Sequence, residues 1–176
     1  MKTKKLILSA LLIAISIILT RFLSFYVPIG GSTTVRAGIG HIPILLAGMF
    51  LGPLAGAFVG GISDVLGVVM FAPYAPFPGF TLSAVCLGFL AGLCMKFFKN
   101  KTLSFKHIVL LVFVAEIPAS MFINTLSASI LYAIPFSFLF PIRAVSTTVF
   151  SILYSILVYG IYKKLIRLDY IKSILE

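Results

Sequence analysis

Acidic residues are scarce in this chain: its 176 residues include 4 Asp and Glu against 14 Lys and Arg, and charged residues make up only 10% of the total. A soluble domain typically carries about 25% charged residues. With 61% hydrophobic residues and a mean hydropathy of +1.19, the chain has too little polar surface to cover a soluble core. The composition argues against a soluble enzyme, a nucleic-acid-binding protein or a disordered chain. It predicts an integral membrane protein whose main solvent is the lipid bilayer.

Motifs for energy conversion and catalysis are also missing. The sequence has no Gly-x-x-x-x-Gly-Lys-Ser/Thr phosphate loop, so no ATPase site is recognisable, and it has no His-Glu-x-x-His or Gly-x-Ser-x-Gly motif. The two histidines, His41 and His107, lie far apart in the sequence. Cys86 and Cys94 share one apolar segment and are expected to be small buried hydrophobes. We therefore predict no enzyme activity, no metal site and no cofactor.

Six apolar segments occupy most of the chain, each about long enough to cross a bilayer. We expect them at residues 6–25, 35–51, 54–71, 80–98, 108–132 and 144–162, which together make one six-helix membrane domain over residues 1–176. The first segment starts like a signal peptide, but it lacks a small-x-small cleavage site and further apolar runs follow it. The predicted fold class is an all-α integral membrane protein with six transmembrane helices.

The basic residues are distributed unevenly between the two sides of such a bundle. Six spans place both termini on one side, where eleven of the cations would lie: Lys2, Lys4, Lys5, Lys96, Lys99, Lys101, Lys106, Lys163, Lys164, Arg167 and Lys172. The other side would hold three: Arg21, Arg36 and Arg143. Cytoplasmic loops carry an excess of Lys and Arg. Both termini are therefore predicted to be cytoplasmic, and nucleic acid is not a predicted partner.

All three outward cations are arginines. Topology requires only positive charge, whereas a guanidinium group grips a carboxylate or phosphate with two hydrogen bonds. Arg21, Arg36 and Arg143 therefore indicate an anion site in the outer half, and the alternative is interfacial snorkelling at helix ends. Two outward connections are rich in proline and aromatics, at residues 72–79 and 133–143. These connections are interpreted either as a lid over a flat ligand or as part of the aromatic belt at the membrane surface.

Two carboxylates, Asp64 and Glu116, lie deep inside apolar segments. An ionised group at such a depth costs at least about 2.5–3.5 kcal/mol on insertion scales, so each should face the bundle interior. A structural role would pair the carboxylate with a buried arginine or with an amide such as Asn124. A functional role would bind a donor-rich heterocycle, because a pterin offers an N–H beside an NH₂ group that one carboxylate can accept together.

Several motifs together resemble the substrate-binding S components of energy-coupling factor (ECF) transporters, and among these the folate type. The matching stretches are VRAGIGHIP, GPLAG, ISDVLG, FPGFTLSA and INTLSASILYAIPFSFLFPIR, and the helix 1 pattern Ala10-x-x-x-Ala14 also matches. Such a component is expected to bind a vitamin from the outside of the cell membrane. It then associates with a membrane coupling subunit and two cytoplasmic ATPase subunits, which supply the energy for uptake.

The resemblance also assigns residues, one motif at a time. Ala10 and Ala14 match the surface that meets the coupling subunit, and residues 77–80 (Phe77, Pro78, Gly79 and Phe80) match a gating loop. Arg36, Asp64, Asn124 and Arg143 fall inside the matched motifs, whereas Arg21 and Glu116 do not. We therefore expect Asp64 or Asn124 to hold the pterin edge and the arginines to face the glutamate carboxylates of folate.

Three readings of the function follow. The first is a vitamin-binding transporter subunit, for folate or for another vitamin or heterocyclic precursor. The second is an integral-membrane enzyme that uses Asp64 and Glu116 as acid and base, and the third is a structural membrane protein. The motif resemblance favours the first.

Overall fold

The computed structural model describes residues 2–29, 33–71, 77–98 and 103–165, the side chains of residues 2, 25–29 and 33–37 excepted. In chain order the elements are α1 (Lys2–Arg21), β1 (Ser24–Ile29), β2 (Thr33–Gly38), α2 (His41–Leu51), α3 (Pro53–Phe71), α4 (Pro78–Phe97), α5 (Phe105–Glu116), the π-helix η1 (Ile117–Ile123), α6 (Asn124–Tyr132) and α7 (Phe136–Leu165). Within the described ranges, five helical stretches are long and apolar enough to cross a membrane, and α2 is a shorter apolar helix. The fold is therefore that of a helical membrane protein.

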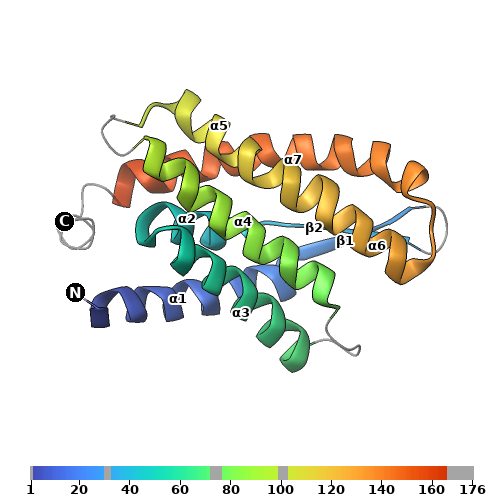
Figure 1. The fold of residues 1–176 in the computed structure, drawn as a ribbon, viewed down its shortest axis with the longest axis horizontal. Coiled ribbons are helices and arrows are strands. Elements are labelled where there is room, and N and C mark those ends of the chain that lie inside the picture. Colours follow the sequence, from blue (N-terminus) through green and yellow to red (C-terminus); the bar gives the residue numbers. More distant parts are fainter. Residues whose placement is uncertain (1, 30–32, 72–76, 99–102, 166–176) are drawn as a thin grey trace.

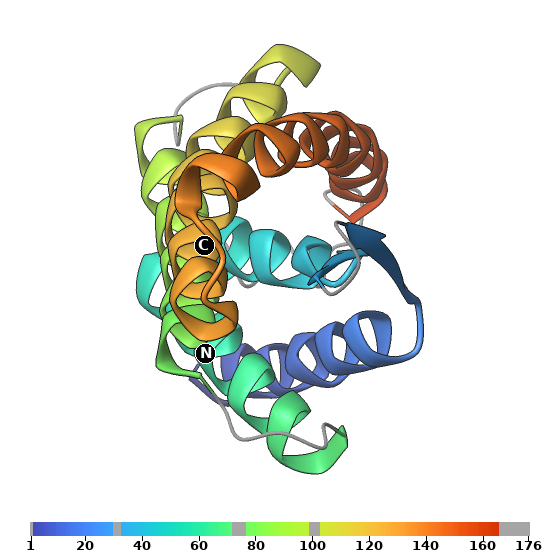
Figure 2. The ribbon, with the colours of Figure 1, turned by 90° about the vertical axis from the view of Figure 1, so that its right-hand side faces the viewer.

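The short helix α2 forms the centre of the molecule. Every residue from Ile42 to Phe50 is buried, and the view along the bundle shows α2 enclosed by the longer helices (Figure 2). Its side chains pack in one core cluster with residues of α4, α5 and α7. An apolar helix buried on all sides is what the uniformly hydrophobic sequence of α2 favours, because such a helix has no polar face to present elsewhere.

The predicted helix over residues 35–51 is only partly helical. Thr33–Gly38 is a strand paired antiparallel with Ser24–Ile29, in a register that places Ser24 opposite Gly38 and Ile29 opposite Thr33. The end of the first predicted segment, at residues 24–25, is also strand, so the helical fold contains one β-hairpin that the sequence analysis did not predict. The β-branched run Thr33-Thr34-Val35 favours a strand, and Gly38 and Gly40 separate it from the helix.

The last two predicted segments are longer in the structure than in the sequence analysis. Residues 133–143 were expected to be a loop, but helix already begins at Phe136, with Pro141 inside it. Residues 105–132 form one continuous apolar stretch whose middle turn is the π-helix η1. Pro118 lies at the start of η1 and has no N–H group to donate, so the helix widens locally at this point.

The two ends of the bundle carry different elements (Figure 1). One end holds the beginning of α1, the end of α4, the beginning of α5 and the end of α7. The opposite end holds the hairpin, the end of α3, the beginning of α4 and the turn between α6 and α7. The described lysines, at positions 4, 5, 96, 106, 163 and 164, all belong to the elements at the first end.

Glycines allow α2, α3 and α4 to approach until their backbones touch. A Cβ atom at Gly48 would lie 2.5 Å from the carbonyl oxygen of Gly88, and one at Gly92 would lie 2.5 Å from the nitrogen of Pro53. A Cβ at Gly88 would overlap the backbone of Gly56. Small residues at helix interfaces in membranes act in this way, because packing replaces the hydrophobic effect as the source of association.

Gly88→Ala is expected to lower the thermal midpoint, because the added methyl group has no space between α3 and α4. Overpacking of this kind typically costs about 1–3 kcal/mol of the free energy of unfolding. Unfolding of the detergent-purified protein, followed by size-exclusion chromatography after heating, measures the change. Gly160→Ala is the matched control, since a Cβ there meets nothing within 4 Å. Equal midpoints for the two variants would contradict the proposed packing.

Candidate functional site

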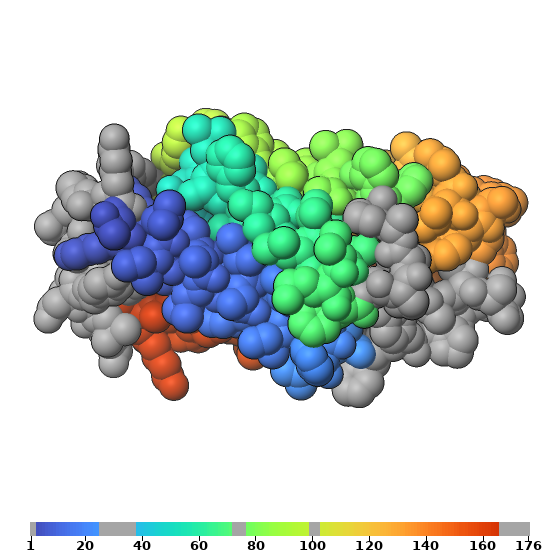
Figure 3. All heavy atoms as spheres, turned by 90° about the horizontal axis from the view of Figure 1, so that it is seen from below, coloured from blue at the N-terminus to red at the C-terminus, as the bar shows by residue number. Residues whose placement is uncertain are grey.

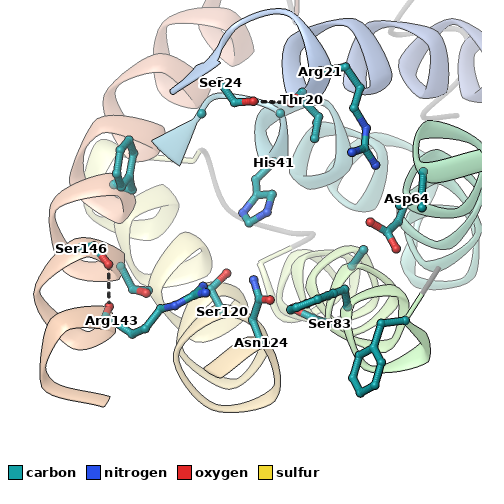
Figure 4. A pocket seen from close by; sticks show the side chains of 18 of the residues that line it. Thr20, Arg21, Ser24, His41, Asp64, Ser83, Ser120, Asn124, Arg143 and Ser146 are labelled. Atoms are coloured by element: carbon teal, nitrogen blue, oxygen red, sulfur yellow. Dashed lines mark hydrogen bonds between the residues drawn. The ribbon is translucent and has the colours of Figure 1, made fainter. Parts of the chain in front are cut away.

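A polar cavity of about 180 Å³ lies within the bundle. Its wall is built by α1, the bases of the two strands, α2, α3, α4, η1, α6 and α7, so nearly every element contributes (Figure 4). A single buried water needs only about 10–15 Å³ by this kind of measure. The cavity is therefore of a size for a small-molecule ligand, and it has several polar and charged groups in its wall.

Most of the predicted binding residues meet in this cavity. Those in its wall are Arg21, Asp64, Phe77, Phe80, Asn124 and Arg143. Pro78 and Gly79 are in the first turn of α4, between two wall residues, without being part of the wall themselves. Arg36 belongs to β2, and its side chain lies outside the described part of the structure. Residues from five different helices, spread over more than 120 positions of sequence, thus surround one space.

The two arginines in the wall have no carboxylate partner among the described residues. Neither Arg21 nor Arg143 forms a salt bridge with any described residue, and the Nε atom of each is buried with no hydrogen-bond partner there. The guanidinium of Arg21 passes over Gly67, where a Cβ would lie 3.1 Å from its Nε. Buried polar groups are normally satisfied. Two guanidinium groups that face one cavity, each with an unsatisfied buried Nε atom and no carboxylate partner, indicate an anionic ligand.

Asp64 is oriented by a neighbouring helix. The hydroxyl of Thr81 on α4 donates a hydrogen bond to Oδ2 of Asp64 on α3, with an oxygen–oxygen distance of 2.8 Å. Thr81 itself is not in the cavity wall. Among the described residues Asp64 has no cationic partner. The Asp64 carboxylate is thus oriented by Thr81, a residue outside the cavity wall, and remains available to a ligand with N–H donors.

Glu116, which is buried, is used differently from the half-buried Asp64. Its Oε1 lies 2.8 Å from Nδ1 of His41, and the hydroxyl of Ser120 donates to its Oε2. Glu116 is 2% exposed and is not in the cavity wall, whereas His41 and Ser120 are. The sequence analysis expected an arginine or Asn124 as the structural partner of Glu116. The partner is His41, 75 positions away.

Aromatic side chains cover one part of the cavity wall. Phe77 and Phe80 form an edge-to-face pair with ring centroids 5.6 Å apart. Between them, Gly79 packs so closely on Ser127 that a Cβ at position 79 would overlap the Ser127 hydroxyl. The FPGF sequence therefore docks directly on α6. Phe150 and Tyr154 of α7 also line the cavity, and the sequence analysis did not select them.

Sequence comparison identifies the family. The family model described as "ECF transporter, substrate-specific component" matches residues 4–168. The chain belongs to the substrate-specific (S) components of ECF transporters. This S component is 36% identical over 173 residues to the folate transporter FolT of Clostridium novyi (strain NT), an alignment that covers 98% of this chain and 96% of the relative.

Solved structures agree with that assignment. A crystal structure of FolT bound with folic acid matches with a TM-score of 0.73 and 25% identity, over 90% of this S component and 91% of that chain. The S component for biotin from an ECF-type ABC transporter shares the fold, with a TM-score of 0.71 and 22% identity over 92% of each chain. This S component is accordingly a multi-pass membrane transport protein and not an enzyme, which removes the acid–base reading of Asp64 and Glu116.

The residues expected at the partner interface lie away from the cavity. Ala10 and Ala14 are both exposed on α1, and the apolar side chains of Leu6, Leu11 and Ile18 are exposed on the same helix. Figure 3 shows α1 at the surface beside α3. This face is apolar over most of its length.

Proposed function

We propose that this S component captures folate from the outside for ATP-driven uptake. The observation that carries the proposal is the cavity itself, which combines a carboxylate, two arginines without a carboxylate partner among the described residues, and an aromatic pair. The relative with 36% identity is a folate transporter, and the matching FolT structure holds folic acid. An S component for another vitamin or heterocyclic precursor is the alternative within the same family.

We assign groups of the cavity to two parts of folate, the pterin and the glutamate tail. Asp64 or Asn124 accepts the N–H and NH₂ donors of the pterin edge, and Phe77 and Phe80 stack on or close over the flat ring. The glutamate tail carries two carboxylates, and bidentate arginine–carboxylate pairs are among the strongest polar contacts available in proteins. Arg143 and Arg21 are placed for that role, and Arg36 is a third candidate.

We further propose six membrane crossings with both termini in the cytoplasm. The five long helical stretches supply five crossings, and α2 together with the strand before it supplies the sixth. Cytoplasmic ends of helices are rich in Lys and Arg. The described lysines belong to the bundle end that holds the beginning of α1 and the end of α7, which supports a cytoplasmic location for that end. The polar cavity then opens toward the outer half.

The energy for uptake comes from partner subunits in this proposal. No phosphate loop is present in the sequence, so a membrane coupling subunit and two cytoplasmic ATPase subunits must supply it. Ala10 and Ala14 on the exposed face of α1 are the proposed contact with the coupling subunit. Small residues permit close helix contact within a membrane.

Binding of radiolabelled folate to the detergent-purified protein tests the proposed substrate. We expect about one folate per chain with a submicromolar Kd. Pteroate, which lacks the glutamate tail, should bind more weakly, and Arg143→Lys should reduce the difference between the two ligands, because lysine lacks the bidentate fork. Tight binding of a different vitamin without folate binding would keep the family assignment and refute the proposed substrate.

A further inference from the structure

The pairing of His41 with Glu116 adds an imidazole to the cavity wall, and no role was assigned to this histidine from the sequence, although it lies in the VRAGIGHIP stretch. His41 begins α2, and the close-up places its ring in the middle of the cavity, between Asp64 and Arg143 (Figure 4). Its side chain is 31% exposed, while that of its partner Glu116 is 2% exposed. One member of the pair is therefore accessible from the cavity, and the other lies behind it.

The hydrogen bonds of Glu116 determine which nitrogen of His41 faces inward. Oε2 accepts from the hydroxyl of Ser120, and Oε1 lies 2.8 Å from Nδ1 of His41. If the Glu116 carboxylate is ionised it can only accept hydrogen bonds, and Nδ1 of His41 is then the donor of this one. Among the described residues no hydrogen bond to Nε2 is present. The imidazole thus has one nitrogen committed to the protein and one free for a ligand.

The surrounding elements restrict rotation of the imidazole. The ring of Tyr154 on α7 lies 5.8 Å from that of His41 between centroids, and the Tyr154 hydroxyl donates to the carbonyl of Gly38, 2.5 Å away. Ser120 belongs to the π-helix η1, which directly follows Glu116 in the chain. π-Helical turns inside α-helices occur frequently at functional sites. An imidazole held by its Nδ1 atom and packed against an aromatic ring is a preorganised binding group.

We propose that Nε2 of His41 forms a hydrogen bond to the bound ligand, and that Glu116 and Ser120 are positioning residues that hold the imidazole for it. The ligand group is a polar edge of the heterocycle, because His41 lies between Asp64, a proposed pterin contact, and Arg143, which is proposed to face the tail (Figure 4). This inference rests on the proposed function, since folate is the probe.

Two substitutions of His41 separate the ligand contact from the contact with Glu116. His41→Asn keeps an amide near the position of Nδ1, so it preserves the bond to Glu116 and removes the group at Nε2. His41→Gln reaches the position of Nε2 and loses the bond to Glu116. We expect His41→Asn to weaken folate binding about 10-fold or more, and His41→Gln to recover part of the loss.

The positioning role of Glu116 is tested by combining substitutions. Glu116→Gln alone should weaken folate binding by roughly 3- to 10-fold. In the His41→Asn background the same change should have little further effect on the Kd, because the group that it positions is already gone. A residue with a purely structural role would weaken binding equally in both backgrounds. His107→Asn is the matched control, since His107 is not in the cavity wall and should leave the Kd unchanged.

The outcomes distinguish the two proposals. Thermal midpoints of all variants are measured alongside the Kd, so a loss of folding is recognised separately from a loss of binding. Folate binding by the wild type together with full binding by folded His41→Asn would overturn the role of His41 and leave the proposed function intact. Full additivity of Glu116→Gln and His41→Asn would overturn the positioning role. No folate binding by the wild type would overturn both.

Discussion

Asp64→Asn is expected to weaken folate binding by about 1.5–3 kcal/mol, which is roughly a 10- to 100-fold increase in Kd. The expected loss is large because hydrogen bonds to a charged acceptor contribute more than neutral ones. In the proposed contact the carboxylate accepts two donors of the pterin edge at once, whereas an amide would offer one acceptor and place an N–H against a donor of the ligand. Equilibrium binding of radiolabelled folate to the purified variant measures the change.

Thr81→Val tests whether the hydrogen bond from Thr81 to Asp64 contributes to folate binding. The Thr81 hydroxyl donates to Oδ2 of Asp64 at 2.8 Å and is outside the cavity wall. Its removal should affect the ligand only through the orientation of the carboxylate, with an expected loss of about 0.5–1.5 kcal/mol in binding. Val has nearly the same shape as Thr, so packing between α3 and α4 is preserved.

The two variants are expected to differ in how much they weaken folate binding. Asp64→Asn should bind folate more weakly than Thr81→Val, and both should keep the thermal midpoint of the ligand-free wild type within a few degrees. If folded Asp64→Asn binds folate like the wild type, Asp64 is not part of the binding site. Asn124 would then be the remaining candidate for the pterin edge.

Much of the site was predictable because membrane insertion makes charged residues informative. Lysine and arginine are interchangeable as topology signals, so the presence of arginines alone on one predicted side indicated an anion site as well as a topology. Two of them, Arg21 and Arg143, line the cavity with unpartnered Nε atoms. Asp64 and Glu116 were both considered because a carboxylate in an apolar helix should face the interior, and Asp64 was preferred because it falls inside a matched motif. It is in the same wall.

The hairpin and the His41–Glu116 pair were not predictable by the same reasoning. Hydropathy does not separate a buried strand from a buried helix, so residues 35–51 were read as one helix although 33–38 form a strand. Glu116 and His41 are 75 positions apart, and only the packing of α2 into the core cluster that it shares with α4, α5 and α7 brings them together. The signal that was present is the single ionisable side chain at the start of an otherwise apolar helix, at His41.

Ala10→Leu and Ala14→Leu are expected to abolish folate uptake while folate binding stays unchanged. Both positions are exposed on α1 and lie outside the cavity wall, so a larger side chain there disturbs neither the fold nor the site. The added atoms instead stand on the face proposed to meet the coupling subunit, where small residues let helices approach closely. Uptake of radiolabelled folate by cells that co-express the coupling and ATPase subunits measures the loss, and binding to purified protein measures the retained function.

Gly160→Leu is the matched control for these two substitutions. It also adds an apolar side chain to an exposed membrane helix, but on α7, where a Cβ meets nothing within 4 Å. Increased apolar surface alone would reduce uptake for all three variants, whereas a contact specific to α1 reduces it only for the alanine variants. Normal uptake with both Ala10→Leu and Ala14→Leu would move the proposed interface away from α1. Selective loss of uptake in the two alanine variants would mean that ligand binding and coupling to the partner subunits use different parts of the bundle. In α1, Arg21 lines the cavity near one end of the helix, and the exposed Ala10 and Ala14 lie nearer the other end.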